Sequence, residues 1–120
     1  MGPASPKVYD LEERTFAFAR RVRQFVKMLP RTIGNIEDVR QVVRSSGSVG
    51  ANYIEANEAL GKKDFRMHLR ISRKEAKETR YWLRLLDTGP APETATECLA
   101  LIQESNELML IFGAILQKTG

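Results

Sequence analysis

The sequence has little cysteine or histidine, with one of each among 120 residues. The single cysteine, Cys98, excludes an internal disulfide, so we expect a reducing compartment, the cytoplasm. There is no uninterrupted run of about 18 apolar residues, and we expect no membrane-spanning helix. The first residues also lack the basic stretch and apolar core of a signal peptide. A chain of this length is expected to form a single domain, here residues 1–120.

The same scarcity limits the chemistry that the chain can perform. A di-metal carboxylate site in a helical bundle needs Glu-x-x-His pairs on two helices, and only His68 is present. One histidine and one cysteine are too few for a usual zinc site. The serines of Ser45–Ser48 fall within a predicted helix, which excludes the strand-to-helix turn that holds a hydrolase nucleophile. No glycine-rich loop follows a strand, which excludes the phosphate-binding loops of nucleotide-binding folds. We therefore expect no enzyme activity, no metal and no cofactor.

Strand-like alternation is also missing, and apolar residues instead repeat every three or four positions, the helical period. Helix breakers fall at residues 30–35, at Gly61 and at residues 88–92, and Asn35 is predicted to cap the second helix. The pattern predicts four helices, near residues 10–29, 36–60, 63–87 and 93–118. Short connections make consecutive helices antiparallel neighbours. We therefore predict an all-α fold, an up-down antiparallel four-helix bundle.

Positive charge is concentrated in two of the four segments. The net charge of +4 is divided into +4 for residues 1–31, −2 for residues 32–60, +5 for residues 61–87 and −3 for residues 88–120. The third helix carries six cations at helical spacing, namely Arg66, Arg70, Arg73, Lys77, Arg80 and Arg84. Clustered charge attracts anionic partners even when the total is small.

These cations are the candidate nucleic-acid site. The residues concerned are Arg20, Arg23 and Lys27 of the first helix and Arg66, Arg70, Arg73 and Lys77 of the third. The guanidinium group matches phosphate oxygens, and each neutralised phosphate releases counterions. The alternative is a solvated face, or cations paired with acids such as Glu55 and Glu58. Arg80 and Arg84 are expected to be structural.

Base stacking would require exposed aromatic side chains. The aromatic residues of the first helix are predicted to lie on or near its core face, and those of later helices are predicted to lie at helix or subunit interfaces. Tyr9 alone is expected to be exposed and available for stacking. The residues placed in this way are Phe16, Phe18, Phe25, Tyr53, Tyr81 and Trp82. We therefore expect any nucleic-acid binding to follow the phosphate backbone, with little sequence preference.

The second helix has apolar residues on more than one face. Its inward stripe is predicted to be Ile36, Val43, Gly47, Gly50 and Ile54, with the glycines allowing close approach of a neighbouring helix. A surplus of apolar residues remains on the second, third and fourth helices, and such surplus favours self-association. The predicted oligomer interface comprises Val42, Val49, Tyr53, Ala56, Trp82, Leu108 and Phe112.

Three stretches carry a resemblance to a known family: RSSGSVGANYIEANEA at 44–59, KKDF at 62–65 and RKEAKETRYWLRLL at 73–86. They resemble the bacterial four-helix-bundle family of 23S rRNA intervening-sequence proteins, also called S23 ribosomal proteins. The resemblance implies a ring-like homopentamer and gives no established activity. The chain is more distantly similar to the accessory variability protein of diversity-generating retroelements, which implies a basic surface for nucleic acid and a reverse transcriptase.

Together these observations predict a non-enzymatic homo-oligomer. We expect it to bind structured RNA or DNA through its basic first and third helices. The alternative is a protein-interaction scaffold whose arginines meet an acidic protein partner.

Overall fold

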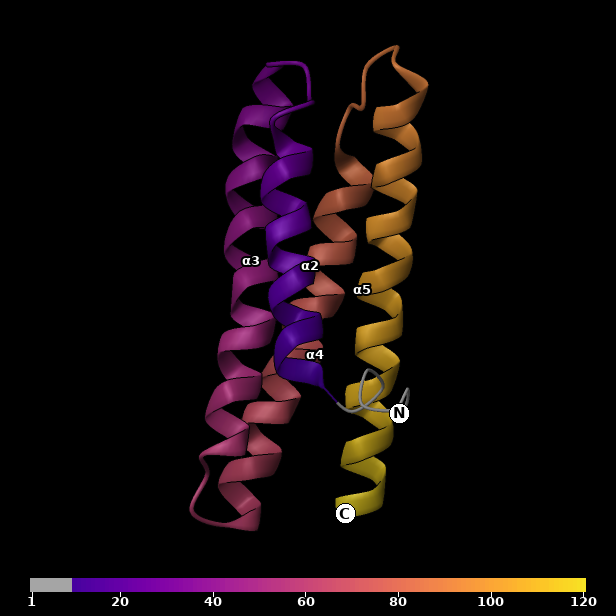
Figure 1. The fold of residues 1–120 in the computed structure, drawn as a ribbon. Coiled ribbons are helices and arrows are strands. Elements are labelled where there is room, and N and C mark those ends of the chain that lie inside the picture. The colour runs from indigo at the N-terminus through magenta and orange to yellow at the C-terminus, as the bar shows by residue number, and fades with distance from the viewer. Residues whose placement is uncertain (1–9) are drawn as a thin grey trace.

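The computed structural model describes residues 10–120, which form four helices (Figure 1). These are α2 (Leu11–Val26), α3 (Ile33–Asn57), α4 (Lys62–Leu85) and α5 (Pro92–Thr119). Consecutive helices run in opposite directions and pack side by side. The predicted all-α, up-down four-helix bundle is confirmed, and the helix ends lie within three residues of their predicted positions.

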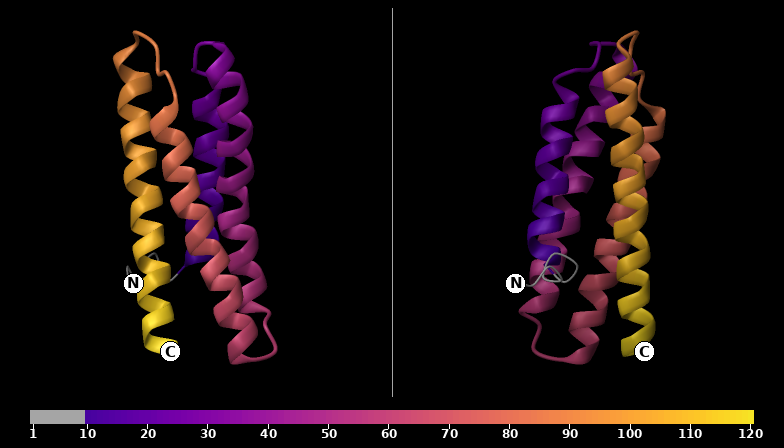
Figure 2. Two further views of the ribbon diagram at one scale, coloured as in Figure 1. Left: turned by 180° about the vertical axis from the view of Figure 1, so that it is seen from behind. Right: turned by 45° about the vertical axis from the view of Figure 1, so that its right-hand side comes forward.

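The four helices are arranged as the corners of a square. Helix α3 has α2 and α4 as its backbone neighbours, and α5 has α4 and α2, whereas the diagonal pairs meet only through side chains such as Tyr53 and Phe112. Figure 2 shows α4 between α5 and α3 when the bundle is seen from behind. The seam between α2 and α3 and the seam between α4 and α5 therefore lie on opposite sides of the bundle.

The buried faces of α2 and α4 follow the helical period. Helix α2 buries Leu11, Thr15, Phe18, Val22 and Phe25, and α4 buries Leu69, Ser72, Ala76, Thr79 and Leu83. Both sets follow the three-and-four spacing that places side chains on one face of a helix. The remaining positions of these two helices carry most of the exposed cations.

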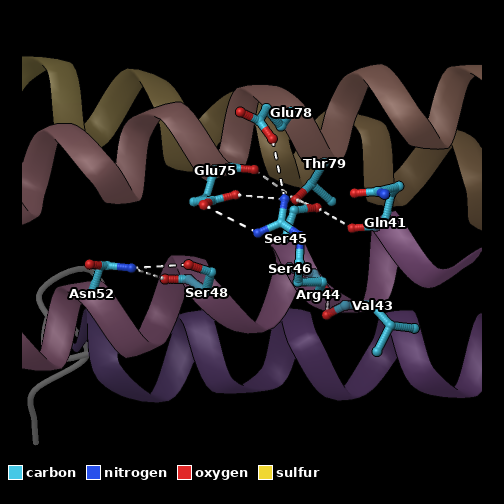
Figure 3. A network of polar contacts seen from close by, with 10 residues as sticks. All are labelled: Gln41, Val43, Arg44, Ser45, Ser46, Ser48, Asn52, Glu75, Glu78 and Thr79. Carbon is cyan, nitrogen blue, oxygen red and sulfur yellow. Dashed lines mark hydrogen bonds and ion pairs between the residues drawn. The ribbon is translucent and has the colours of Figure 1, made fainter. Parts of the chain in front are cut away.

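The core face of α3 was predicted wrongly. Val42 and Val49 are fully buried, whereas Ile36 and Ile54 are 44% and 47% exposed. The buried face is completed by hydroxyl groups: Ser45 Oγ donates to the Gln41 carbonyl at 2.8 Å and accepts from Thr79 Oγ1 at 2.7 Å (Figure 3). These bonds satisfy the buried hydroxyls, so small polar residues take the core positions that hydropathy assigned to isoleucine.

Most of the predicted oligomer interface lies instead in the core of the single chain. Val42, Val49, Ala56, Leu108 and Phe112 are all buried within the bundle. Tyr53 and Trp82 are half-buried against the same core, and the Tyr53 and Phe112 ring centroids lie 5.9 Å apart. The five buried side chains are therefore not available to a second subunit.

Asn35 does not cap α3, because Thr32 takes that position and its side chain accepts from the Asn35 backbone N–H at 3.0 Å. The Asn35 side chain is buried instead. Its Nδ2 donates to the carbonyls of Pro30 at 2.9 Å and Asp87 at 2.8 Å, and its Oδ1 accepts from the Asp87 N–H at 3.0 Å. One amide thus joins the α2–α3 connection to the α4–α5 connection.

Gly47 and Gly50 of α3 face α2, and Gly50 gives the close approach that the sequence predicted. A Cβ atom at Gly50 would lie 2.8 Å from Thr15 Oγ1, which is closer than a real contact allows. Thr15 cannot easily move, because its hydroxyl is buried and donates to the Leu11 carbonyl at 2.7 Å. At Gly47 the nearest atom to an added Cβ is Arg23 Nη2, at 3.4 Å, so a guanidinium lies over this glycine.

Helix α5 is long and apolar enough, by length and composition, to cross a membrane, with mean hydropathy 1.4 over an 18-residue window. By this criterion, the sequence alone was not sufficient to exclude a membrane-spanning helix. In the single chain 28% of that window is buried, and α5 as a whole buries Cys98, Leu101 and Leu108 against the other helices. The expectation of no membrane contact stays a prediction.

Candidate nucleic-acid interface

A groove of about 790 Å³ runs along the seam between α4 and α5. Its lining consists of Arg70, Arg73, Lys74, Lys77, Met109, Leu110, Gly113, Ala114 and Gln117. The four cations come from α4 and are all exposed, whereas α5 contributes a largely apolar floor. No carboxylate lines the groove, so its charge is entirely positive.

The acids of α4 are directed away from this groove, toward α3. Arg44 of α3 reaches between Glu75 and Glu78, with its Nη1 3.4 Å from Glu75 Oε2 and its Nη2 3.3 Å from Glu78 Oε1 (Figure 3). Glu75 is almost fully buried in this position. The two carboxylates within the basic stretch of α4 are therefore paired on the α3–α4 seam and do not neutralise the cations that face α5.

Three of the four acids of α5 pair with arginines of α2. Arg14 Nε lies 2.8 Å from Glu104 Oε2, its Nη2 lies 2.8 Å from Glu107 Oε1, and Arg21 Nη2 lies 3.0 Å from Glu97 Oε1. The hydrogen bond with Glu104 raises the pKa of Arg14 above its ordinary value despite partial burial. Hydrogen bonds from Gln103 and Arg14 lower the pKa of Glu107. The α2–α5 seam is thus neutralised, in contrast to the α4–α5 seam.

The structure brings three of the predicted residues of α4 together and separates the fourth. Arg70, Arg73 and Lys77 line the groove, and they are joined by Lys74, which sequence reasoning missed. Lys74 lies four residues after Arg70 and three before Lys77, so helical spacing alone contained the signal. These four residues are called the basic groove cluster below.

Arg66 is a structural residue and is removed from the candidate site. Its Nη1 donates to the Leu116 carbonyl and, at 2.7 Å, to Thr119 Oγ1. A helix leaves its last carbonyls without partners, and Arg66 satisfies one of them at the end of α5. Arg80 Nη1 similarly donates to Asn106 Oδ1 at 2.6 Å, as expected for a structural arginine. Arg84 is exposed and has no partner among the described residues.

Gly113 gives Arg73 its position across the groove. A Cβ atom at Gly113 would lie 3.8 Å from Arg73 Nη1 and 3.9 Å from Arg73 Cδ. The arginine side chain therefore extends from α4 over the surface of α5 at the one groove position that has no side chain. Its guanidinium has no carboxylate partner within residues 10–120.

The predicted cations of α2 lie elsewhere. Arg20, Arg23 and Lys27 are exposed. Arg20 and Arg23 line a cleft between α2 and α3, and α2 makes no contact with α4. The two basic stripes therefore do not form one continuous surface on a single chain.

The carboxylate and amide side chains in the last turns of α3 do not form a metal site. Among residues 10–120, no group of three or more His, Cys, Asp or Glu side chains is placed to hold a metal ion. Glu55 and Glu58 are exposed and make no ion pair with a described residue, so the alternative in which they neutralise the cations is not seen within the chain. Asn57 bonds across helices, since its Nδ2 donates to Glu12 Oε2 at 2.8 Å.

Two aromatic side chains are more exposed than predicted. Phe16 is 57% exposed and Tyr81 is 56% exposed. Phe16 precedes the buried Phe18 by two residues, which places it on the other side of α2. Tyr9, the aromatic predicted to be free, lies outside the described residues.

The comparisons with known proteins agree with this fold. The family model described as 23S rRNA-intervening sequence protein matches residues 8–111. A crystal structure of a protein of unknown function from the S23 ribosomal protein family of Bacteroides thetaiotaomicron is similar, with 29% identity and a TM-score of 0.73. The alignment covers 88% of this chain and 94% of that one. No curated protein matches. The chain therefore belongs to the 23S rRNA-intervening sequence protein family.

Proposed function

We propose that this protein is a non-enzymatic, homo-oligomeric bundle that binds RNA or DNA by its phosphate backbone along the α4–α5 groove. One observation carries the proposal. Two acids of α4, Glu75 and Glu78, are paired with Arg44, and three acids of α5 are paired with Arg14 or Arg21, all on other seams. The basic groove cluster is therefore left without a carboxylate. Unneutralised cations on a helix repel one another slightly, and an anionic ligand relieves that cost.

The chemistry of the groove favours phosphate contacts over base recognition. Arg70 and Lys77 are two helical turns apart, about 11 Å along the axis, so the cluster suits an extended row of charges. The floor formed by Met109, Leu110 and Ala114 is apolar. Side chains of this kind offer no hydrogen bonds to base edges. We therefore expect little sequence preference.

The salt dependence of binding tests this proposal. Fluorescence anisotropy of a labelled RNA hairpin would be measured at 50 and 200 mM salt. Four phosphate contacts predict a slope of about −3.6 in log affinity against log salt, hence about a 100-fold loss of affinity over this range. Affinity that changes little with salt would contradict phosphate binding. An absence of binding at 50 mM would leave a protein-interaction scaffold as the function to pursue.

We further propose that the chain self-associates through exposed apolar side chains in place of the buried ones first predicted. Large apolar residues are exposed on several helices. They include Ile33 at 85% exposure on α3, and Leu99 and Leu110 on α5 at 67% and 61%. Leu99 and Leu110 are eleven residues apart, three helical turns, and so share one face of α5. The family resemblance implies a homopentamer, which would repeat the groove around a ring and add avidity.

Light scattering of the purified protein tests self-association. A pentamer would have five times the 13.6 kDa mass of the chain. A 13.6 kDa species at micromolar concentration would contradict the proposal. A mass of two to four chains would support self-association and contradict the pentamer.

A further inference from the structure

A second cleft, of about 330 Å³, lies between α2 and α3, on the side of the bundle opposite the basic groove cluster. Its lining consists of Glu12, Thr15, Phe16, Ala19, Arg20, Arg23, Gly47, Gly50, Ala51 and Ile54. The floor is made of alanine and glycine, because α3 presents small residues where α2 comes close. The volume is at the lower end of the range for small-molecule sites.

One wall of this cleft is an exposed aromatic ring. Phe16 of α2 is 57% exposed, and Ile54 of α3 is 47% exposed. A planar ligand placed between them would cover two apolar surfaces that water now reaches. Aromatic side chains at accessible positions beside cations are the elements that proteins use to stack unpaired bases.

Two arginines stand beside that ring. The Arg20 guanidinium carbon lies 5.8 Å from the centroid of the Phe16 ring. Arg23 Nη1 donates to the Ala19 carbonyl at 3.2 Å, which holds its guanidinium over Gly47. Neither arginine forms an ion pair with a carboxylate of residues 10–120. Their remaining N–H groups make no hydrogen bond to a described residue and can donate to an anion.

From these contacts we infer that the α2–α3 cleft binds an unpaired nucleotide of a nucleic-acid strand, with its base stacked on Phe16 and its phosphate bound by Arg20 and Arg23. A second copy of this chain is a poorer occupant, because it would have to cover both arginines and supply carboxylates to pair with them. The inference shares the ligand class of the proposed function but concerns a different surface. It adds a preference for unpaired nucleotides that the α4–α5 groove does not explain.

The test compares two labelled RNAs of equal length, a single strand without secondary structure and a blunt duplex. Stacking of one base is worth about 1–3 kcal/mol, which is a loss of between about 5-fold and 150-fold. We expect Phe16→Ala to weaken binding of the single strand at least 5-fold and to leave duplex binding unchanged. Phe16→Trp should retain single-strand affinity, whereas Phe16→Leu, apolar without an aromatic face, should lose it.

Several outcomes would overturn the inference. One is an equal loss for strand and duplex, and another is unchanged single-strand affinity in Phe16→Ala. A fall in the solution mass of Phe16→Ala would show that a second copy covers the cleft. Tighter binding of free adenosine monophosphate than of the strand would assign the cleft to a mononucleotide instead. A different result would contradict the proposed function, namely duplex affinity that does not change when cations of the basic groove cluster are reversed to glutamate.

Discussion

Reversing Arg70 and Arg73 to glutamate is expected to lower the affinity for RNA about 100-fold at 50 mM salt, because two phosphate contacts become two repulsions. The salt slope should also fall, from about −3.6 to about −1.8, since two of four contacts remain. Both side chains are exposed and make no ion pair with a described residue, so folding should be unaffected. Anisotropy titration of the double variant at two salt concentrations measures both quantities.

The matched control reverses two cations outside the groove. Arg31 and Arg40 are exposed and unpaired among residues 10–120, and Arg31→Glu with Arg40→Glu changes the net charge by the same amount. We expect this control to lose no more than a few-fold in affinity through long-range electrostatics, which salt screens. Equal losses in the two double variants would mean that binding responds to net charge and has no site at the α4–α5 groove.

The second large effect concerns stability. Phe112→Ala is expected to lower the free energy of unfolding by about 3–5 kcal/mol, the usual cost of removing a buried phenyl ring. The ring has no exposed surface in the single chain and packs beside Tyr53. Urea unfolding followed by circular dichroism measures this change. Because oligomers gain stability with concentration, the measurement should be repeated at several protein concentrations.

Leu110→Ala on the same helix is the control for Phe112→Ala. Leu110 is 61% exposed, so its truncation should change the free energy of unfolding of the single chain by no more than about 0.5 kcal/mol. A Phe112→Ala protein that unfolds like the wild type but has a smaller solution mass would instead restore Phe112 to a subunit interface. The pair of variants therefore separates core packing from self-association.

The fold was predictable because two helices carry a one-sided pattern. In α2 and α4, cations occupy the positions opposite the buried ones, so hydropathy and charge agree on the face that is buried. Breakers such as Pro30 and Pro90 mark the connections, and short connections leave an antiparallel arrangement as the economical one. These features require no knowledge of the partner helix.

The faces of α3 and α5 were not predictable in this way. In α3 the core is filled by Ser45 and Ser46, whose buried hydroxyls are satisfied by α4 or by their own helix, so hydropathy favours the wrong side. Helix α5 is apolar around most of its circumference: Leu108 is buried and Leu110 exposed. For such helices the identity of the neighbour decides which side is buried.

Only the part of the candidate site on α4 could be located from the sequence, because the predicted cations of α2 lie on another seam. The spacing of cations on α4 located the groove, but the role of each cation depends on what faces it from the next helix. Arg66 meets the carbonyl end of α5, whereas Arg73 meets Gly113. Phe16 was predicted to lie on or near the core face of its helix, and only the position of α3 shows that it faces a cleft.

The buried amide of Asn35 links residues 52 positions apart in the chain, at the end of the bundle where two connections meet. A protein with one cysteine has no disulfide with which to close such a loop. Here two hydrogen bonds to Asp87 close it reversibly, and a third, to Pro30, includes the α2–α3 connection. Opening of either connection breaks bonds that hold the other. The two turns therefore behave as one cooperative unit of local unfolding, although they belong to different halves of the molecule.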